Sequence, residues 1–158
     1  MRFAALAVLA LTATVAAAAQ EAKSVPYWAS IGAGRARMRT GPARTYPATW
    51  LYQRADLPVR VVAVFKEWRK VEDPDGTQGW MQGSLLSATR TAIVRGARPV
   101  AMLEEPASGS RMKWRAAPGV VGRVSRCGAG WCSFDVKGRA GFVPVADLWG
   151  VDPGEDLP

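Results

Sequence analysis

The chain has 158 residues, a formal net charge of +8, two cysteines and no histidine. A chain of this length holds one ordinary domain or two very small ones. The absence of histidine excludes the Cys–His nucleophile of cell-wall peptidases and removes the commonest side-chain ligand of metal ions. A moderately basic surface favours anionic partners through long-range attraction.

Residues 1–19 predict a signal peptide. Arg2 supplies the positive charge, residues 3–16 form an apolar run, and Ala17–Ala19 provide small residues before a cleavage site. The alternative is an uncleaved membrane anchor, but the run is short and rich in alanine and threonine. We therefore expect a periplasmic or secreted protein with no stable membrane span after cleavage.

The remainder of the chain is dominated by short β-rich runs separated by glycine and proline. These runs cover residues 59–65, 68–72, 79–81, 120–126, 131–136 and 140–143. Runs of this length with frequent turn signals are typical of an all-β barrel or sandwich. Asp75-Gly76 lies between two of the runs and predicts a tight turn, because glycine accepts a positive φ at no steric cost.

The later part of the chain repeats the earlier part. The shared pattern is a tryptophan, a turn, a glycine–aromatic pair and a leucine, found at Trp68, Trp80 and Leu86 and again at Trp131, Phe142 and Leu148. An internal repeat sets the number of modules. We therefore predict one barrel at 27–88, a connector at 89–97, a second barrel at 98–150 and an acidic tail at 151–158. Within the connector, Thr91–Val94 could pair as a closing strand.

Cys127 and Cys132 are predicted to form a disulfide, since export places them in an oxidising compartment. In the repeat alignment they correspond to Val64 and Arg69, which flank a hairpin turn. The second module is poorer in aromatic residues, so it has more need of a covalent staple. No metal site and no cofactor are predicted.

These motifs resemble the bacterial SH3-like family, in particular the exported two-module type of alphaproteobacteria. The first module matches through residues 37–42, 46–50, 57–59, 68–71, 75–76, 79–81 and 84–87, and the second through residues 118–121, 127, 131–132 and 148–155. The resemblance implies an all-β protein of two tandem small SH3-like antiparallel barrels, exported and without catalysis of its own. Related modules bind cell-wall peptides or target hydrolases. Gln82 stands where many relatives have histidine, and Asp56 where a turn glycine is expected.

In SH3-type modules the long early loop forms a wall of the ligand groove, so the resemblance implies a site near residues 37–54. The candidate ligand-binding residues are Arg37, Arg39, Tyr46, Trp50, Tyr52 and Trp68, with Arg44 and Arg54 nearby. Arginine beside aromatic rings suits carboxylates, phosphates and peptide backbones. The three early-loop aromatics fit core packing equally well, and Arg39 could instead pin the loop to its own barrel.

The remaining tryptophans divide by position. Trp80 and Phe142 each follow a glycine at the start of a strand and are predicted to plug the barrels. Trp68 and Trp131 lie beside hairpin turns and could be exposed.

Candidate catalytic groups are sparse. Ser110 and Lys113 match the SxxK pattern of serine acyl enzymes, but the accompanying SDN and KTG motifs are missing. The neighbouring acids at 104–105 and at 73 and 75 are expected to be solvated, whereas catalysis requires buried, perturbed groups.

The sequence thus predicts an exported, non-catalytic binding or scaffolding protein. Its first module would recognise a peptidoglycan peptide or an envelope protein. The alternatives are an electrostatic binder of anionic envelope polymers and, remotely, an enzyme. Nucleic acid is not expected as a partner, because export separates the chain from it.

Overall fold

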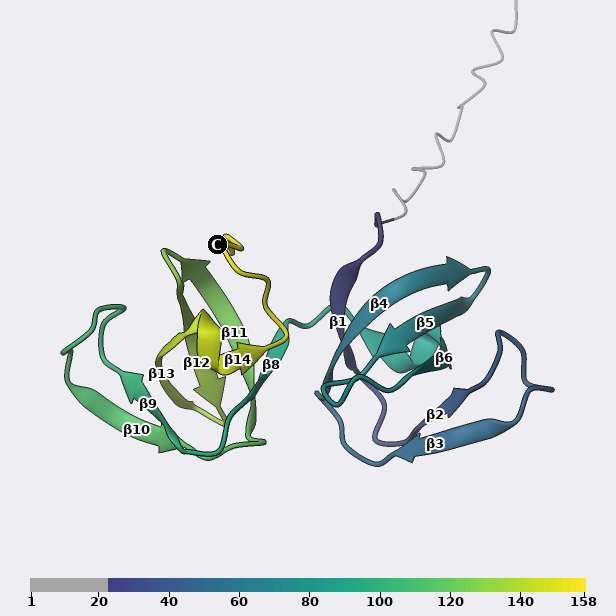
Figure 1. Cartoon of the computed structure of the whole chain (residues 1–158), viewed down its shortest axis with the longest axis horizontal. Helices are drawn as coiled ribbons and strands as arrows, with labels where there is room; N and C mark the ends of the chain where they lie inside the picture. The colour runs from purple at the N-terminus through teal and green to yellow at the C-terminus, as the bar shows by residue number, and fades with distance from the viewer. Residues whose placement is uncertain (1–22) are drawn as a thin grey trace, which may run out of the picture.

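The computed structural model describes residues 23–158, which fold as two small β modules (Figure 1). The predicted signal peptide lies outside the described residues. In the described part of the chain the only helical elements are two short 3-10 turns, and neither is long and apolar enough to cross a membrane.

The first module is an antiparallel sheet with the strand order β3-β2-β6-β5-β4-β1-β7. Its elements are β1 (Tyr27–Ile31), β2 (Ala36–Arg39), β3 (Ala48–Tyr52), β4 (Pro58–Phe65), β5 (Trp68–Glu72), β6 (Gln78–Gln82), η1 (Gly83–Leu85) and β7 (Leu86–Ser87). The hairpin β2–β3 carries the long early loop at one edge of this sheet.

The second module has the equivalent order β10-β9-β13-β12-β11-β8-β14. Its elements are β8 (Thr91–Val94), β9 (Val100–Leu103), β10 (Met112–Ala116), β11 (Val121–Gly128), β12 (Trp131–Val136), β13 (Arg139–Pro144), η2 (Val145–Asp147) and β14 (Leu148–Trp149). Each strand has a counterpart in the first module, so the two tandem modules inferred from the repeat are confirmed.

Strand β8 lies inside the segment that we expected to join the modules. It pairs with β11 and with β14, as β1 pairs with β4 and β7 in the first module. These four residues are therefore part of the second sheet, and little chain is left to act as a linker.

The barrel interiors are filled by aliphatic, methionine and phenylalanine side chains rather than by tryptophan. The first core contains Met38, Val71 and Met81, and the second contains Met102 and Phe134. Side chains alternate across a strand, so the residue that follows an inward-facing glycine points outward.

This alternation overturns the predicted placement of the aromatics. A Cβ on Gly79 would lie 2.3 Å from Cγ of Met38, so the glycine faces the core and leaves room for the methionine. Trp80 consequently points outward and is only partly buried, as is Phe142 in the second module. The prediction that both plug the barrels was wrong.

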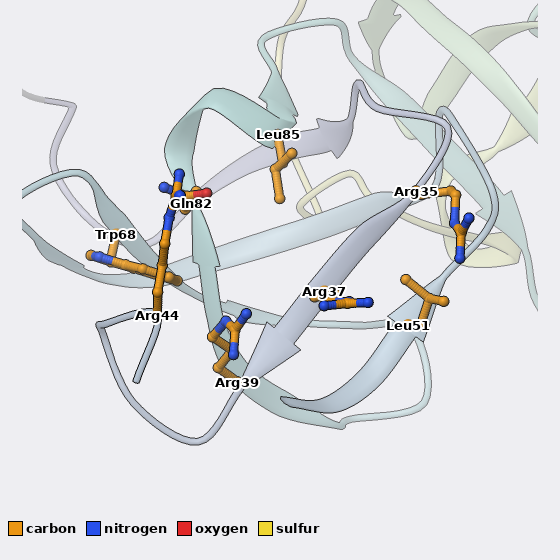
Figure 2. A pocket seen from close by; sticks show the side chains of 8 residues that line it. All are labelled: Arg35, Arg37, Arg39, Arg44, Leu51, Trp68, Gln82 and Leu85. Carbon is orange, nitrogen blue, oxygen red and sulfur yellow. The ribbon is translucent and has the colours of Figure 1, made fainter. Parts of the chain in front are cut away.

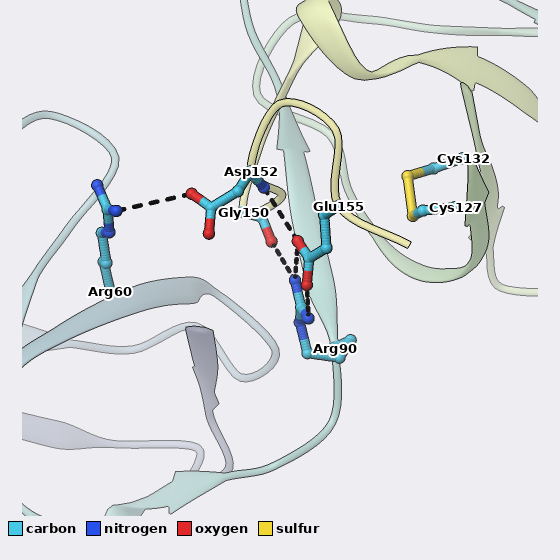
Figure 3. Close-up of polar contacts among 7 residues, drawn as sticks. All are labelled: Arg60, Arg90, Cys127, Cys132, Gly150, Asp152 and Glu155. Carbon is cyan, nitrogen blue, oxygen red and sulfur yellow. Dashed lines mark hydrogen bonds and ion pairs between the residues drawn. A yellow bond between two sulfur atoms is a disulfide. The ribbon is translucent and has the colours of Figure 1, made fainter. Parts of the chain in front are cut away.

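The predicted disulfide between Cys127 and Cys132 is present, and both residues are buried in the second core. The repeat alignment also holds at this point, because Val64 and Arg69 face each other directly across β4 and β5. The bond links the two strands of the corresponding hairpin in the second module, β11 and β12, next to the turn (Figure 3).

The modules touch through apolar and polar contacts. Ile93 and Val121 of the second module pack against the first core. The rings of Trp28 and Trp149 meet edge to face with centroids 4.8 Å apart. Arg54 Nη2 donates to the carbonyl oxygen of Gly119 at 2.7 Å. The modules are therefore packed on each other, as expected for such a short connection.

The acidic tail folds back onto the second module and the connection. Arg90 donates to both carboxylate oxygens of Glu155 and to the carbonyl oxygen of Gly150 (Figure 3). Hydrogen bonding from Arg90 holds the pKa of Glu155 below its ordinary value, although burial opposes this. Leu157 packs against the second core. The tail is thus an integral part of the fold.

Candidate functional site

A pocket of about 380 Å³ opens on the first module between strand β2, the early loop, the start of β5 and turn η1. Its lining combines four arginines with apolar and amide side chains: Arg35, Arg37, Arg39, Arg44, Leu51, Trp68, Gln82 and Leu85. Figure 2 shows Arg37 and Arg39 side by side, with Arg44 extended past the indole of Trp68.

Strand alternation places three of these arginines on one face. Ala36 and Met38 point into the core and are almost fully buried, so Arg35, Arg37 and Arg39 project from the opposite face. Leu51 sits directly across from Arg37 on β3 and projects to the same side. The pocket wall is therefore a direct consequence of the order of residues in β2.

Arg39 also fixes the loop that carries Arg44. Its Nη1 donates to the carbonyl oxygen of Tyr46 at 2.8 Å, and the amide of Thr40 donates to Pro47 at 3.1 Å. The ring of Tyr46 lies over Gly41, where a Cβ would come within 2.5 Å of it. The pinning role considered for Arg39 is thus observed, and the same side chain borders the pocket.

Trp68 contributes buried apolar surface to the pocket. It is only 4% exposed, yet it is absent from the hydrophobic core cluster, because it lies on the face of β5 opposite to Val71. Gln82 on β6 lies directly opposite Trp68 on β5. The exposure considered for Trp68 is not observed, and the residue lines the pocket together with Arg44, Gln82 and Leu85.

The pocket has a strong excess of positive charge. No carboxylate lines it, and none of the ion pairs recorded in residues 23–158 involves its arginines. Arginine stays protonated in proteins and presents a planar fork that matches a carboxylate in a bidentate manner. Several such forks in a pocket that is also lined by Trp68 and Leu51 suit an anionic ligand that carries apolar groups as well.

The other predicted site residues lie elsewhere. Tyr52 is 6% exposed and its hydroxyl donates to Oδ2 of Asp73 at 2.7 Å. Burial, followed by this hydrogen bond, raises the pKa of Tyr52 far above its ordinary value. Trp50 is 59% exposed but projects from the face of β3 opposite to Leu51. Arg54 is engaged with the second module, and the ring of Tyr46 is outside the pocket lining.

Sequence reasoning missed Arg35, Leu51 and Leu85 and did not place Gln82 in the site. Arg35 could have been found, because it lies just before β2 and continues the alternation of Arg37 and Arg39 in the sequence. Leu85 gave no signal, since it reaches the pocket only through the turn that follows β6.

The second module lacks the arginine cluster at the equivalent place. Trp80 faces Arg39, and its counterpart Phe142 faces Leu103, so the register makes Leu103 the equivalent of Arg39. By the same register Ala101 stands in place of Arg37. The anion pocket is therefore a feature of the first module.

A sequence model described as the bacterial SH3 domain matches residues 32–88 and again residues 96–150. The chain belongs to the bacterial SH3 domain family. Bacterial SH3 domains are binding domains that generally bind cell-wall components, and they are typically periplasmic or extracellular.

No curated protein matches this bacterial SH3 chain. Similar solved structures include NlpC2 and NlpC1 from Trichomonas vaginalis, each at 11% identity with a TM-score of 0.36. The matches cover 84% and 82% of this chain, which spans 52% and 48%, about half, of those two chains. The family assignment rests on the two sequence matches.

Proposed function

We propose that this bacterial SH3 protein is an exported binding protein whose first module holds a carboxylate-bearing peptide of the cell wall in the arginine pocket. The observation that carries the proposal is that four arginines line one pocket together with the buried Trp68, with no carboxylate in the lining to neutralise them. The early loop is fixed by its own hydrogen bonds, so little order remains to be gained on binding.

From the chemistry of the pocket we expect a ligand with two kinds of group, carboxylates and apolar side chains. Free carboxylates would accept paired N–H donors from Arg37 and its neighbours, each charged hydrogen bond contributing about 1.5–3 kcal/mol. Apolar side chains of the peptide would pack against Leu51 and the small part of Trp68 that remains exposed. A short acidic peptide satisfies both halves, whereas a bare inorganic anion uses only the first.

The test is calorimetric titration of the oxidised mature protein with soluble peptides released from sacculi, compared with the same peptides after their carboxylates are amidated. We expect amidation to abolish binding. Arg37→Ala and Arg44→Ala should each lower the affinity about tenfold. Arg98→Ala, an exposed arginine of the second module, is the matched control and should bind as the wild type does. If the double variant Arg37→Ala/Arg44→Ala bound the peptides with wild-type affinity, the pocket would not be their binding site.

A second candidate is an electrostatic binder of anionic envelope polymers, which is favoured by the formal net charge of +8. Its affinity would fall steeply with salt and would not change when one basic side chain is replaced by another. Arg37→Lys separates the two functions, because lysine keeps the charge but loses the bidentate fork. A loss of affinity in this variant supports the peptide pocket, and unchanged affinity supports the electrostatic binder.

A further inference from the structure

Each module exposes a tryptophan at the same position of the fold. Trp50 on β3 is 59% exposed and Trp114 on β10 is 41% exposed. Trp50 faces Met38 across the β2–β3 ladder, and Trp114 faces Met102 across the β9–β10 ladder. Both methionines are buried in their respective cores, so the two tryptophans are structural equivalents.

Core packing does not account for this repetition. Other residues shared by the two modules, such as Gly79 and Gly141, are buried and spare room for core side chains. At the place of the arginine pocket, the second module has lost two arginines, with Ala101 in place of Arg37 and Leu103 in place of Arg39, although Trp131 keeps the place of Trp68. An exposed indole that persists while its surroundings diverge is the mark of a contact surface, since isolated large apolar groups gain nothing from facing water.

The surroundings of the two rings define what they can bind. Neither ring lines the arginine pocket, and the outer strands β3 and β10 each pair with one neighbour only. Each tryptophan is preceded by an exposed polar residue at a bulge in its ladder, Thr49 on β3 and Lys113 on β10. One indole in such a setting falls far short of the roughly 1,000 Å² that a stable protein interface buries.

A sugar ring fits these limits. Its C–H face is apolar and about as wide as an indole, while its hydroxyls at the rim reach polar side chains beside the stack. The guanidinium of Arg139 lies over the ring of Trp114, 5.3 Å from its centroid, and the ring of Tyr52 lies 6.4 Å from that of Trp50, so the protein itself occupies one side of each indole. Two equal platforms in one chain suit a polymer built of repeated rings.

We propose that Trp50 and Trp114 are two equivalent stacking platforms for the sugar rings of a polysaccharide, separate from the arginine pocket. This site goes beyond the proposed peptide binding and stands independently of it. In Figure 1 the strands that carry the platforms, β3 and β10, both run along the lower margin of the molecule, one in each module.

The experiment is co-sedimentation of the oxidised mature protein with insoluble glycan strands of the cell wall from which all peptides have been removed, in high salt. Because the probe carries no peptide, the result does not depend on the arginine pocket, and Arg37→Ala should leave it unchanged. We expect Trp50→Ala and Trp114→Ala each to weaken retention about tenfold. The double variant should lose it.

Phe65→Ala is the matched control, because Phe65 is an aromatic residue of the β4–β5 hairpin that is 49% exposed. In the second module the corresponding hairpin is closed by the disulfide. Circular dichroism and the urea midpoint verify that each variant is folded. The proposal is overturned if wild-type protein is not retained, if the double variant is retained like the wild type, or if Phe65→Ala lowers retention as much. Dimerisation that depends on both tryptophans, without retention on glycan, would assign the surfaces to a second copy of the chain instead.

Discussion

Removing the hydroxyl of Tyr52 should weaken the first module without affecting its ligand. The hydroxyl donates to Oδ2 of Asp73 at 2.7 Å, and both residues are at least 94% buried. The other carboxylate oxygen of Asp73 accepts the amides of Asp75 at 3.0 Å and Thr77 at 2.8 Å, which form the β5–β6 turn. Tyr52→Phe removes one hydrogen bond to a charged acceptor and should cost about 1.5–2 kcal/mol.

Asp73→Ala should lower the stability further, because it leaves the buried hydroxyl of Tyr52 without its acceptor and removes the acceptor of both turn amides. The amides belong to exposed residues and regain water, so the total is about 3 kcal/mol. Since the two side chains share one interaction, the double variant should cost clearly less than the sum of the single variants.

Urea denaturation of the three variants measures these differences, and calorimetry measures their binding. Peptide affinity should stay within twofold of wild type in Tyr52→Phe, because Tyr52 is not among the pocket residues. A stability loss below about 0.5 kcal/mol in Tyr52→Phe would refute the buried-pair interpretation. A tenfold loss of affinity at unchanged stability would return Tyr52 to the binding site.

Three further changes probe the rest of the fold. Reduction of the disulfide should destabilise the protein by about 2 kcal/mol in the chain-entropy model, measured as a lower urea midpoint, and an unchanged midpoint would contradict a stapling role. Glu155 has a folded pKa below its ordinary 4.5, so its pairing with Arg90 stabilises the fold above that pH and is lost as the pH falls through the lower value. Glu155→Gln should therefore cost about 2 kcal/mol near neutral pH and flatten the acid limb of the stability curve, whereas parallel acid limbs would exclude this pair as its cause. Gly79→Ala should destabilise by about 1–3 kcal/mol, because its methyl would press on Met38, while Gly34→Ala, which meets open space, serves as the control.

The repeat and the strands were readable from the sequence because their signals are local. A tryptophan, a turn and a glycine–aromatic pair recur at nearly constant spacing, and each copy of this pattern marks one hairpin. The inward or outward placement of aromatics was not readable in the same way. Gly79 takes the core-facing position and turns Trp80 outward, a choice decided by Met38 on β2, which neighbours β6 in the sheet but is far from it in the sequence.

The candidate site was located only in part for a similar reason. Arg37, Arg39 and Trp68 do line the pocket, and Arg44 from the same stretch joins them. Trp50 and Tyr52 point to the other face of β3, because the register of the β2–β3 hairpin pairs Leu51, not its neighbours, with Arg37. Register of this kind depends on the turn and on a bulge in the ladder, neither of which has a clear sequence signature here.

The most direct test of peptide binding in the arginine pocket is a heteronuclear NMR titration of the oxidised mature protein with soluble cell-wall peptide. The indole N–H of Trp68 and the side-chain N–H signals of Arg37 and Arg44 should shift together and saturate at one common concentration of peptide. Signals of the equivalent surface in the second module, around Trp131, should stay in place. Shifts confined to the second module, or shifts spread over both modules and removed by salt, would contradict the account.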